Sequence, residues 1–95
     1  MAPDPELLIL ASLADGPKHG YAMMTDIQAL SGVQIGPGTL YTAIPRLTEQ
    51  GLIEALPTTD RRRPYRLTAQ GATVLRDQLD ALRRFSEASL LRLNP

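Results

Sequence analysis

Hydroxyl, aromatic and guanidinium side chains are concentrated in two stretches of the chain, and their chemistry suits the recognition of phosphate groups and base edges. The first stretch, GPGTLYTAIPRLTEQGLI, runs from Gly36 to Ile53 and carries Thr39, Tyr41 and Thr42 near the start of an expected helix. A helix N-terminus attracts phosphate, and hydroxyl groups bond either phosphate oxygens or bases. This stretch is therefore a candidate DNA-reading helix.

The second stretch is the arginine run Arg61, Arg62 and Arg63, with Arg66 close behind and only Asp60 opposing it locally. A guanidinium group is well suited to binding phosphate. The whole chain has ten basic and ten acidic residues and a formal net charge of zero, which counts mildly against nucleic-acid binding. The clustering of the arginines nevertheless predicts one basic ridge.

The expected helix in the first stretch has an apolar and a polar face. The residues on the apolar face are Leu40, Ala43, Ile44, Leu47 and Gly51, at helical spacing. The outward face carries Gly38, Thr42, Pro45, Arg46 and Glu49. Two alternatives stay open: Arg46 can form a surface salt bridge with Glu49, and the segment can be an ordinary core helix followed by a solvated loop.

Two helices are expected before this one. Asp4-Pro5-Glu6 is a strong helix start, and the following helix is apolar nearly all round, which calls for cover on more than one side and hints at a second subunit. The second helix is expected at about Tyr21–Leu30, with Met23, Ile27 and Leu30 buried and Ser31-Gly32 at its end. Val33–Ile35 alternates and is expected to form a short strand.

A hairpin and a long helix are expected after the candidate reading helix. Leu52–Leu56 and Tyr65–Leu67 have strand character, and the intervening prolines and polar residues predict a long, mobile tip. Thr68 is a plausible N-cap for a final helix at about Ala69–Arg92. Its apolar stripe is Ala72, Leu75, Leu79, Leu82 and Phe85. No other segment is left to bury the distal half of this stripe.

Composition excludes several classes of protein. The absence of cysteine excludes disulfides and thiolate zinc sites and is consistent with the cytoplasm. No apolar run approaches the roughly 20 residues of a membrane span. His19 has no companion metal ligand, and the chain shows neither a nucleophile–base pair nor a glycine-rich phosphate loop. We therefore expect no enzyme, no metal and no cofactor.

Three segments resemble the PadR family of winged-helix transcriptional regulators, in the subgroup with a single short C-terminal helix. They are LLILASLADGPKHGYAM at Leu7–Met23, GPGTLYTAIPRLTEQGLIE at Gly36–Glu54 and RRRPYRLTAQG at Arg61–Gly71. The resemblance implies a dimeric repressor with its third helix in the major groove, its wing on the backbone or minor groove, and its last helix packed on the partner's first helix. Many members have proline directly after the tyrosine of GTLY, where this chain has Thr42, with Pro45 further on.

The resemblance and the patterns together predict an α+β, mainly α fold: a winged helix-turn-helix at 1–68 and a long C-terminal dimerisation helix at 69–95, as one compact unit. The expected DNA-binding residues are Lys18, His19, Tyr21, Gly38, Thr39, Tyr41, Thr42, Arg46, Arg61, Arg62 and Arg63. The expected dimerisation residues are Leu8, Leu75, Leu79, Leu82 and Phe85. The expected partners are double-stranded DNA, with an inverted-repeat operator, and a second copy of the chain; an effector is left open. The alternative is a winged-helix protein-interaction module without DNA binding.

Overall fold

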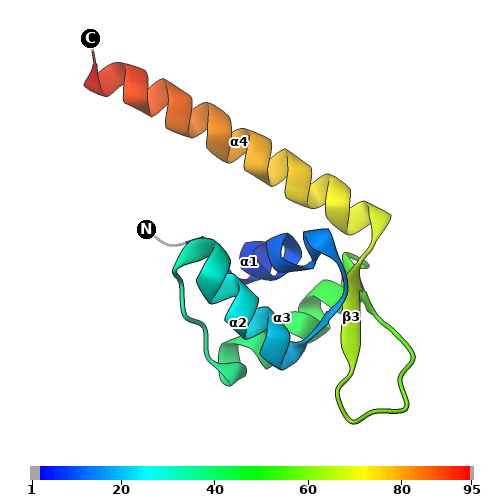
Figure 1. The fold of residues 1–95 in the computed structure, drawn as a ribbon. Helices are drawn as coiled ribbons and strands as arrows, with labels where there is room; N and C mark the ends of the chain where they lie inside the picture. Colours follow the sequence, from blue (N-terminus) through cyan, green and yellow to red (C-terminus); the bar gives the residue numbers. More distant parts are fainter. Residues whose placement is uncertain (1–2, 95) are drawn as a thin grey trace.

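Helices account for most of the computed structural model, which describes residues 3–94 (Figure 1). In chain order the elements are α1 (Pro5–Ser12), a 3-10 turn (Leu13–Asp15), β1 (Lys18–His19), α2 (Gly20–Ser31), α3 (Pro37–Glu49), β2 (Ile53–Ala55), β3 (Pro64–Leu67) and α4 (Ala69–Leu93). This is the predicted winged helix-turn-helix with a long C-terminal helix. The small sheet and the α4 extension distinguish it from a plain helical bundle.

Capping residues define the helix ends as predicted. The Asp4 carboxylate accepts a hydrogen bond from the Leu7 N–H at 3.0 Å, and the Thr68 hydroxyl accepts one from the Gly71 N–H at 3.0 Å. Each bond satisfies an N–H group that has no partner inside the helix. Gly32 follows α2 with a left-handed φ of 73°, a conformation that glycine adopts without steric cost.

The apolar side chains of α1 are buried within their own chain. They are Leu7, Leu8, Ile9, Leu10 and, just beyond the helix, Leu13, and none is more than 7% exposed. Helices α2, α3 and α4 all contact α1 and cover it from several sides. The expectation that α1 needs a second subunit is therefore not supported by its burial. Leu8, expected at the dimer interface, is only 4% exposed before any partner is present.

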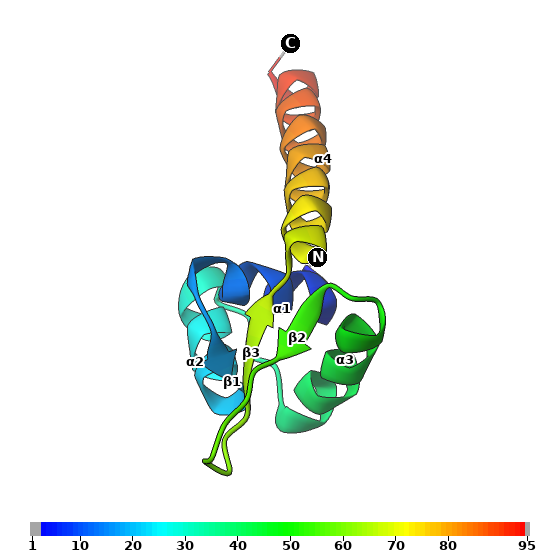
Figure 2. The ribbon, with the colours of Figure 1, turned by 90° about the vertical axis from the view of Figure 1, so that its right-hand side faces the viewer.

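The three-stranded antiparallel sheet has the order β1-β3-β2 (Figure 2). Lys18 of β1 lies opposite Tyr65 of β3, and Ile53 of β2 lies opposite Leu67. The β2–β3 pair is the predicted hairpin, and its loop, residues 56–63, is called the wing loop below. Strand β1 was not predicted, whereas the strand expected at Val33–Ile35 is absent because that segment pairs with no strand within residues 3–94.

Helix α3 buries the predicted face, with Leu40, Ala43, Ile44 and Leu47 in the core. The helix is continuous through Pro45, which is exposed. Proline cannot donate the bond to the Tyr41 carbonyl, and the solvent-facing position leaves water to serve that carbonyl. The prediction that Leu30 is buried is wrong. Leu30 is 59% exposed in the last turn of α2, and Val33 and Ile35 from the following loop pack against the core.

Helix α4 is anchored at its first turns and then leaves the rest of the molecule (Figure 1). Leu75 is buried, but Leu79, Leu82 and Phe85 are 45%, 49% and 68% exposed. The molecule is accordingly elongated, with extents of 58 × 26 × 21 Å. Among residues 3–94, no helix has the combination of length and apolar character that crossing a membrane requires.

Candidate nucleic-acid interface

The solvent-facing side of α3 carries five of the predicted DNA-binding residues, all of them exposed: Gly38, Thr39, Tyr41, Thr42 and Arg46. Gly36 occupies the cap position, without a side-chain cap bond. The threonines therefore do not cap this helix. The Thr42 hydroxyl donates to the Gly38 carbonyl at 2.8 Å, which leaves its oxygen lone pairs free to accept a bond from a ligand.

Arg46 extends from the same face in the last turns of α3. The alternative role considered for it was a salt bridge to Glu49, but within residues 3–94 no ion pair joins these two side chains. The guanidinium is therefore available to a partner. Its five donors suit either a phosphate or the two major-groove acceptors of guanine.

Tyr41 lies against the first residue of α2. A methyl group placed on Gly20 would come within 2.3 Å of the Tyr41 hydroxyl oxygen. Glycine at this position therefore allows the phenol of α3 to approach the start of α2. The ring is still 54% exposed, so its hydroxyl can meet a ligand from solvent.

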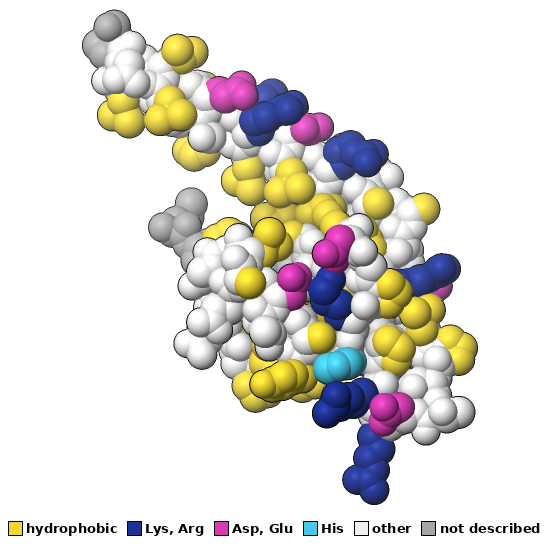
Figure 3. All heavy atoms as spheres, viewed as in Figure 1, with side chains coloured by type: hydrophobic (Ala, Val, Ile, Leu, Met, Phe, Trp, Pro, Cys, Tyr) yellow, Lys and Arg dark blue, Asp and Glu magenta, His cyan; other side chains and the backbone are white. Residues whose placement is uncertain are grey.

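A hollow of about 240 Å³ lies between the start of α2, α3 and the wing. We call it the wing hollow; its lining residues are His19, Gly20, Tyr21, Tyr41, Arg61, Arg62, Arg63 and Tyr65. Figure 3 shows the histidine beside Lys and Arg side chains at this end of the molecule. The structure thus brings together predicted DNA-binding residues from three separate segments.

Besides Gly20, the lining residue that sequence reasoning missed as a site residue is Tyr65. It was treated only as part of a strand, and it reaches the hollow because β3 pairs with β1 directly before α2. A two-residue strand carries almost no periodicity, so no signal in the sequence indicated this pairing.

His19 forms the N-terminal cap of α2. Its Nδ1 accepts a hydrogen bond from the Ala22 N–H at 3.4 Å. In a neutral ring with Nδ1 as acceptor, the hydrogen is on Nε2. His19 therefore stabilises the start of α2 and keeps an N–H donor available.

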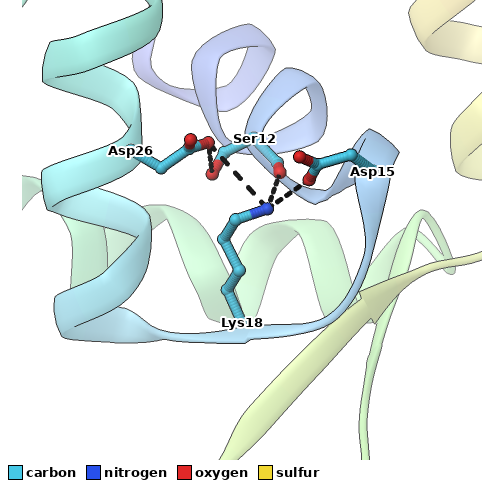
Figure 4. Close-up of polar contacts among 4 residues, drawn as sticks. All are labelled: Ser12, Asp15, Lys18 and Asp26. Atoms are coloured by element: carbon cyan, nitrogen blue, oxygen red, sulfur yellow. Dashed lines mark hydrogen bonds and ion pairs between the residues drawn. The ribbon is translucent and has the colours of Figure 1, made fainter.

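Lys18 has a different environment from the one predicted. Its ammonium group donates to the Ser12 carbonyl at 2.5 Å and to the Asp15 carboxylate, and lies 3.9 Å from the Asp26 carboxylate (Figure 4). The Ser12 hydroxyl donates to Asp26 at 2.6 Å. With its side chain only 17% exposed, Lys18 connects the end of α1 to α2.

The ion pair with Lys18 also affects Asp15. The hydrogen bond from the ammonium, followed by its positive charge, lowers the pKa of the Asp15 carboxyl below its ordinary value. The protonated form of the Asp15 carboxyl is thereby disfavoured in the folded protein.

The wing loop is shaped by its own polar side chains. The Thr58 hydroxyl accepts from the Asp60 N–H at 3.0 Å, and the Asp60 carboxylate accepts from the Arg61 N–H at 2.6 Å. Arg61, Arg62 and Arg63 are all exposed. Arg66, by contrast, is paired across the hairpin with Glu54. Within residues 3–94, no group of three or more His, Asp or Glu side chains can hold a metal ion.

Comparison with known proteins gives a family match over most of the chain. The model of the transcriptional regulator PadR-like family matches residues 9–77. A curated relative, an uncharacterised 37.1 kDa protein in transposon TN4556 of Streptomyces fradiae, is 41% identical over 83 residues. That match covers 87% of this chain but only 24% of the relative, so the chain spans about a quarter of the relative's length.

Solved structures share the fold. A PadR family transcription regulator from Clostridium difficile R20291 superimposes with a TM-score of 0.82 at 22% identity, covering 93% of this chain and 96% of that one. A PadR family transcriptional regulator from Eggerthella lenta has a TM-score of 0.77 at 29% identity, covering 88% and 76%. The first comparison bears on the fold alone.

Proposed function

Because the chain belongs to the PadR-like family of transcriptional regulators, we propose that it binds double-stranded DNA in a sequence-specific manner and acts as a dimeric repressor. The observation that supports this best is the wing hollow, where Tyr41 from the exposed side of α3 meets three wing arginines. No cofactor is part of the proposal, and the cytoplasm is its proposed location.

Helix α3 is the proposed reading element. Its buried face fixes it on the core, so that Thr39, Thr42 and Arg46 project from a rigid support. A helix fits the major groove of B-DNA, where each base pair presents a distinct pattern of donors and acceptors. The end of α3 nearest the wing hollow would approach the sugar-phosphate backbone of the DNA, and the outward face of α3 would approach the bases.

The wing is the proposed source of sequence-independent affinity. Arg61, Arg62 and Arg63 are exposed on a loop, and phosphate contacts need less positional accuracy than base contacts. Phosphate neutralisation releases counterions and makes binding depend strongly on salt. This local charge compensates for a formal net charge of zero over the chain.

A second copy of the chain is the proposed partner for α4. The exposed Leu79, Leu82 and Phe85 form an apolar stripe that stays largely uncovered within residues 3–94. Two copies related by a two-fold axis would present two α3 helices, and the operator would then be an inverted repeat.

Fluorescence anisotropy with a labelled random duplex, at about 50 and 200 mM salt, tests the proposal. We expect binding that weakens steeply with salt, and selection from a randomised duplex library should enrich a two-fold symmetric site. The zero net charge favours a protein-interaction module as the second candidate. Absence of binding at the lower salt concentration would support that candidate and reject ours.

A further inference from the structure

Every tyrosine of the chain and its single histidine line the wing hollow. The sequence contains three tyrosines and one histidine, and Tyr21, Tyr41, Tyr65 and His19 all lie in this lining. They come from three segments that are separate in sequence: β1 with the adjoining start of α2, then α3, and β3. The fold therefore gathers these side chains in one place.

The lining consists of hydrogen-bond donors and lacks carboxylates. Phenol, imidazole and guanidinium groups can all donate, and none of the lining residues is an aspartate or glutamate. At about 240 Å³ the hollow is below the roughly 300–1,000 Å³ of pockets for drug-sized ligands. Its chemistry and size fit a small anion.

The start of α2 adds to the attraction for an anion. Gly20 and Tyr21 are the first two residues of this 12-residue helix and belong to the lining. The first N–H groups of a helix have no partner within it, and the helix dipole is positive at this end. With Nδ1 of His19 bonded to the Ala22 N–H, the Nε2–H of the neutral ring is free to bond a ligand.

We infer that the wing hollow holds one phosphate group of the DNA backbone, bound jointly by donors from α2, α3 and the wing. The inference rests on the proposed function and adds a specific site to it. Because donors from three elements would bind the same phosphate, this contact would fix the wing and the reading helix in one position relative to the duplex. Phosphate contacts set the register of a protein on DNA in this way.

A double-mutant cycle on a random duplex tests whether two elements share one phosphate. Tyr41→Phe removes only a hydroxyl, and His19→Asn removes the imidazole while asparagine still caps α2. We expect each variant to weaken binding about three- to tenfold. The double variant should lose less than the product of the two losses, because the second change acts on a phosphate that is already poorly held.

Control variants separate this site from general charge effects. Thr42→Ala combined with His19→Asn should give losses that multiply, since Thr42 lies outside the lining. Arg62→Gln should lower the slope of log K against log salt by about 0.9, whereas the same change at Arg66, which is paired with Glu54, should leave it unchanged. Thermal melts of all variants would test whether each variant is folded.

The outcomes distinguish the inference from the proposed function. If the wild type binds no duplex, the proposed function fails. If the wild type binds but Tyr41→Phe and His19→Asn bind equally well, only the phosphate site is rejected. The chain has no tryptophan, so its intrinsic fluorescence comes from the three tyrosines of the hollow. A saturable response to inorganic phosphate at constant ionic strength, together with unchanged duplex affinity in Tyr41→Phe, would show a free-phosphate site and overturn the inference.

Discussion

At the scale of single residues, the side chains on the outward face of α3 and those on the wing loop are held in different ways. Thr42 and Arg46 project from a helix whose other face is buried, whereas Arg62 lies on a loop. A base contact requires a side chain held in one position, and a phosphate contact does not. Sequence discrimination and general affinity are therefore expected to depend on different residues.

The first prediction concerns this division. Thr42→Ala or Arg46→Ala should reduce the difference in binding free energy between operator and random DNA by about 1–3 kcal/mol if the base contact is direct. Arg62→Ala should weaken operator and random DNA alike and lower the salt slope by about 0.9. Paired anisotropy titrations on both duplexes measure this. Loss of discrimination in Arg62→Ala, with Arg46→Ala unaffected, would show that the roles are reversed.

Lys18 is the subject of the second prediction. Its ammonium group bonds Ser12 and Asp15 and lies near Asp26, so Lys18→Met should lower the free energy of unfolding by about 1–2 kcal/mol. Because the ammonium does not line the wing hollow, the salt slope of DNA binding should stay the same. Urea unfolding and anisotropy measure the two effects. A salt slope lowered by about one in Lys18→Met would show that Lys18 does contact a DNA phosphate.

The third prediction concerns pH and Asp15. Lys18 lowers the pKa of Asp15 in the folded protein, so ionised Asp15 stabilises the fold above the pKa of the unfolded chain. That stabilisation is lost as the pH falls below about 4 and the carboxyl is protonated. Asp15→Asn should therefore have a slightly lower melting temperature than the wild type at pH 7. The difference should shrink in acid, and one that grows there would contradict the assignment.

At the scale of elements, two glycines of the sequence motifs lie where a neighbouring group leaves no room for a side chain. Gly20 allows the flexible Tyr41 side chain to approach α2. Gly71 in α4 faces backbone, because a methyl group there would lie 2.0 Å from the Leu52 carbonyl oxygen. A side chain can turn away from a new methyl group, but the Leu52 backbone, which directly precedes β2 and accepts a hydrogen bond from the Thr68 N–H, cannot do so without moving the sheet.

The fourth prediction follows from this contrast. Gly71→Ala should destabilise the protein by about 1–3 kcal/mol, because overpacking outweighs the better helix propensity of alanine. Gly38→Ala is the matched control: it also lies in the first turn of a helix, and an added methyl group would meet nothing within 4 Å. The control should be neutral or slightly stabilising. Equal melting temperatures for the two variants would refute the steric explanation.

Local signals in the sequence were sufficient to predict most elements. Capping residues such as Asp4 and Thr68, the Gly32 stop and the apolar face of α3 act within a few residues, and the structure confirms them. Strand β1 exists only through its pairing with β3, so its formation depends on residues distant in sequence. The strand wrongly expected at Val33–Ile35 had the local pattern but has no pairing partner in the part of the chain that the structure describes.

Most members of the candidate site were predictable, although Gly20 and Tyr65 were not, and their arrangement was not predictable. His19, Tyr41 and Arg62 were each expected to face DNA, and their convergence on one hollow depends on tertiary packing. The position of Lys18 illustrates the limit. A lysine beside a predicted site residue suggests a phosphate contact, and only the three-dimensional positions of Asp15 and Asp26 reveal its ion pairs.

At the scale of the whole molecule, one end of α4 belongs to the core and the other extends into solvent (Figure 1). Leu75 is part of the core, whereas Leu79, Leu82 and Phe85 continue the same stripe beyond it. Burial of one such side chain contributes roughly 1.5–3 kcal/mol. Covering all three would stabilise an association strongly, and a self-complementary stripe is suited to a two-fold dimer.

The last prediction is that this stripe makes the dimer. Leu79 and Leu82 are about half exposed within one chain, so replacing both with glutamate should abolish the dimer and leave the winged helix folded. Arg84→Glu is the control, because it changes the charge by the same two units on the exposed face of α4 that points away from the stripe. Light scattering and circular dichroism should show a folded monomer for the leucine variant and a dimer for the control. A folded dimer in the leucine variant would place the interface elsewhere, and a wild-type monomer at micromolar concentration would reject the dimer itself.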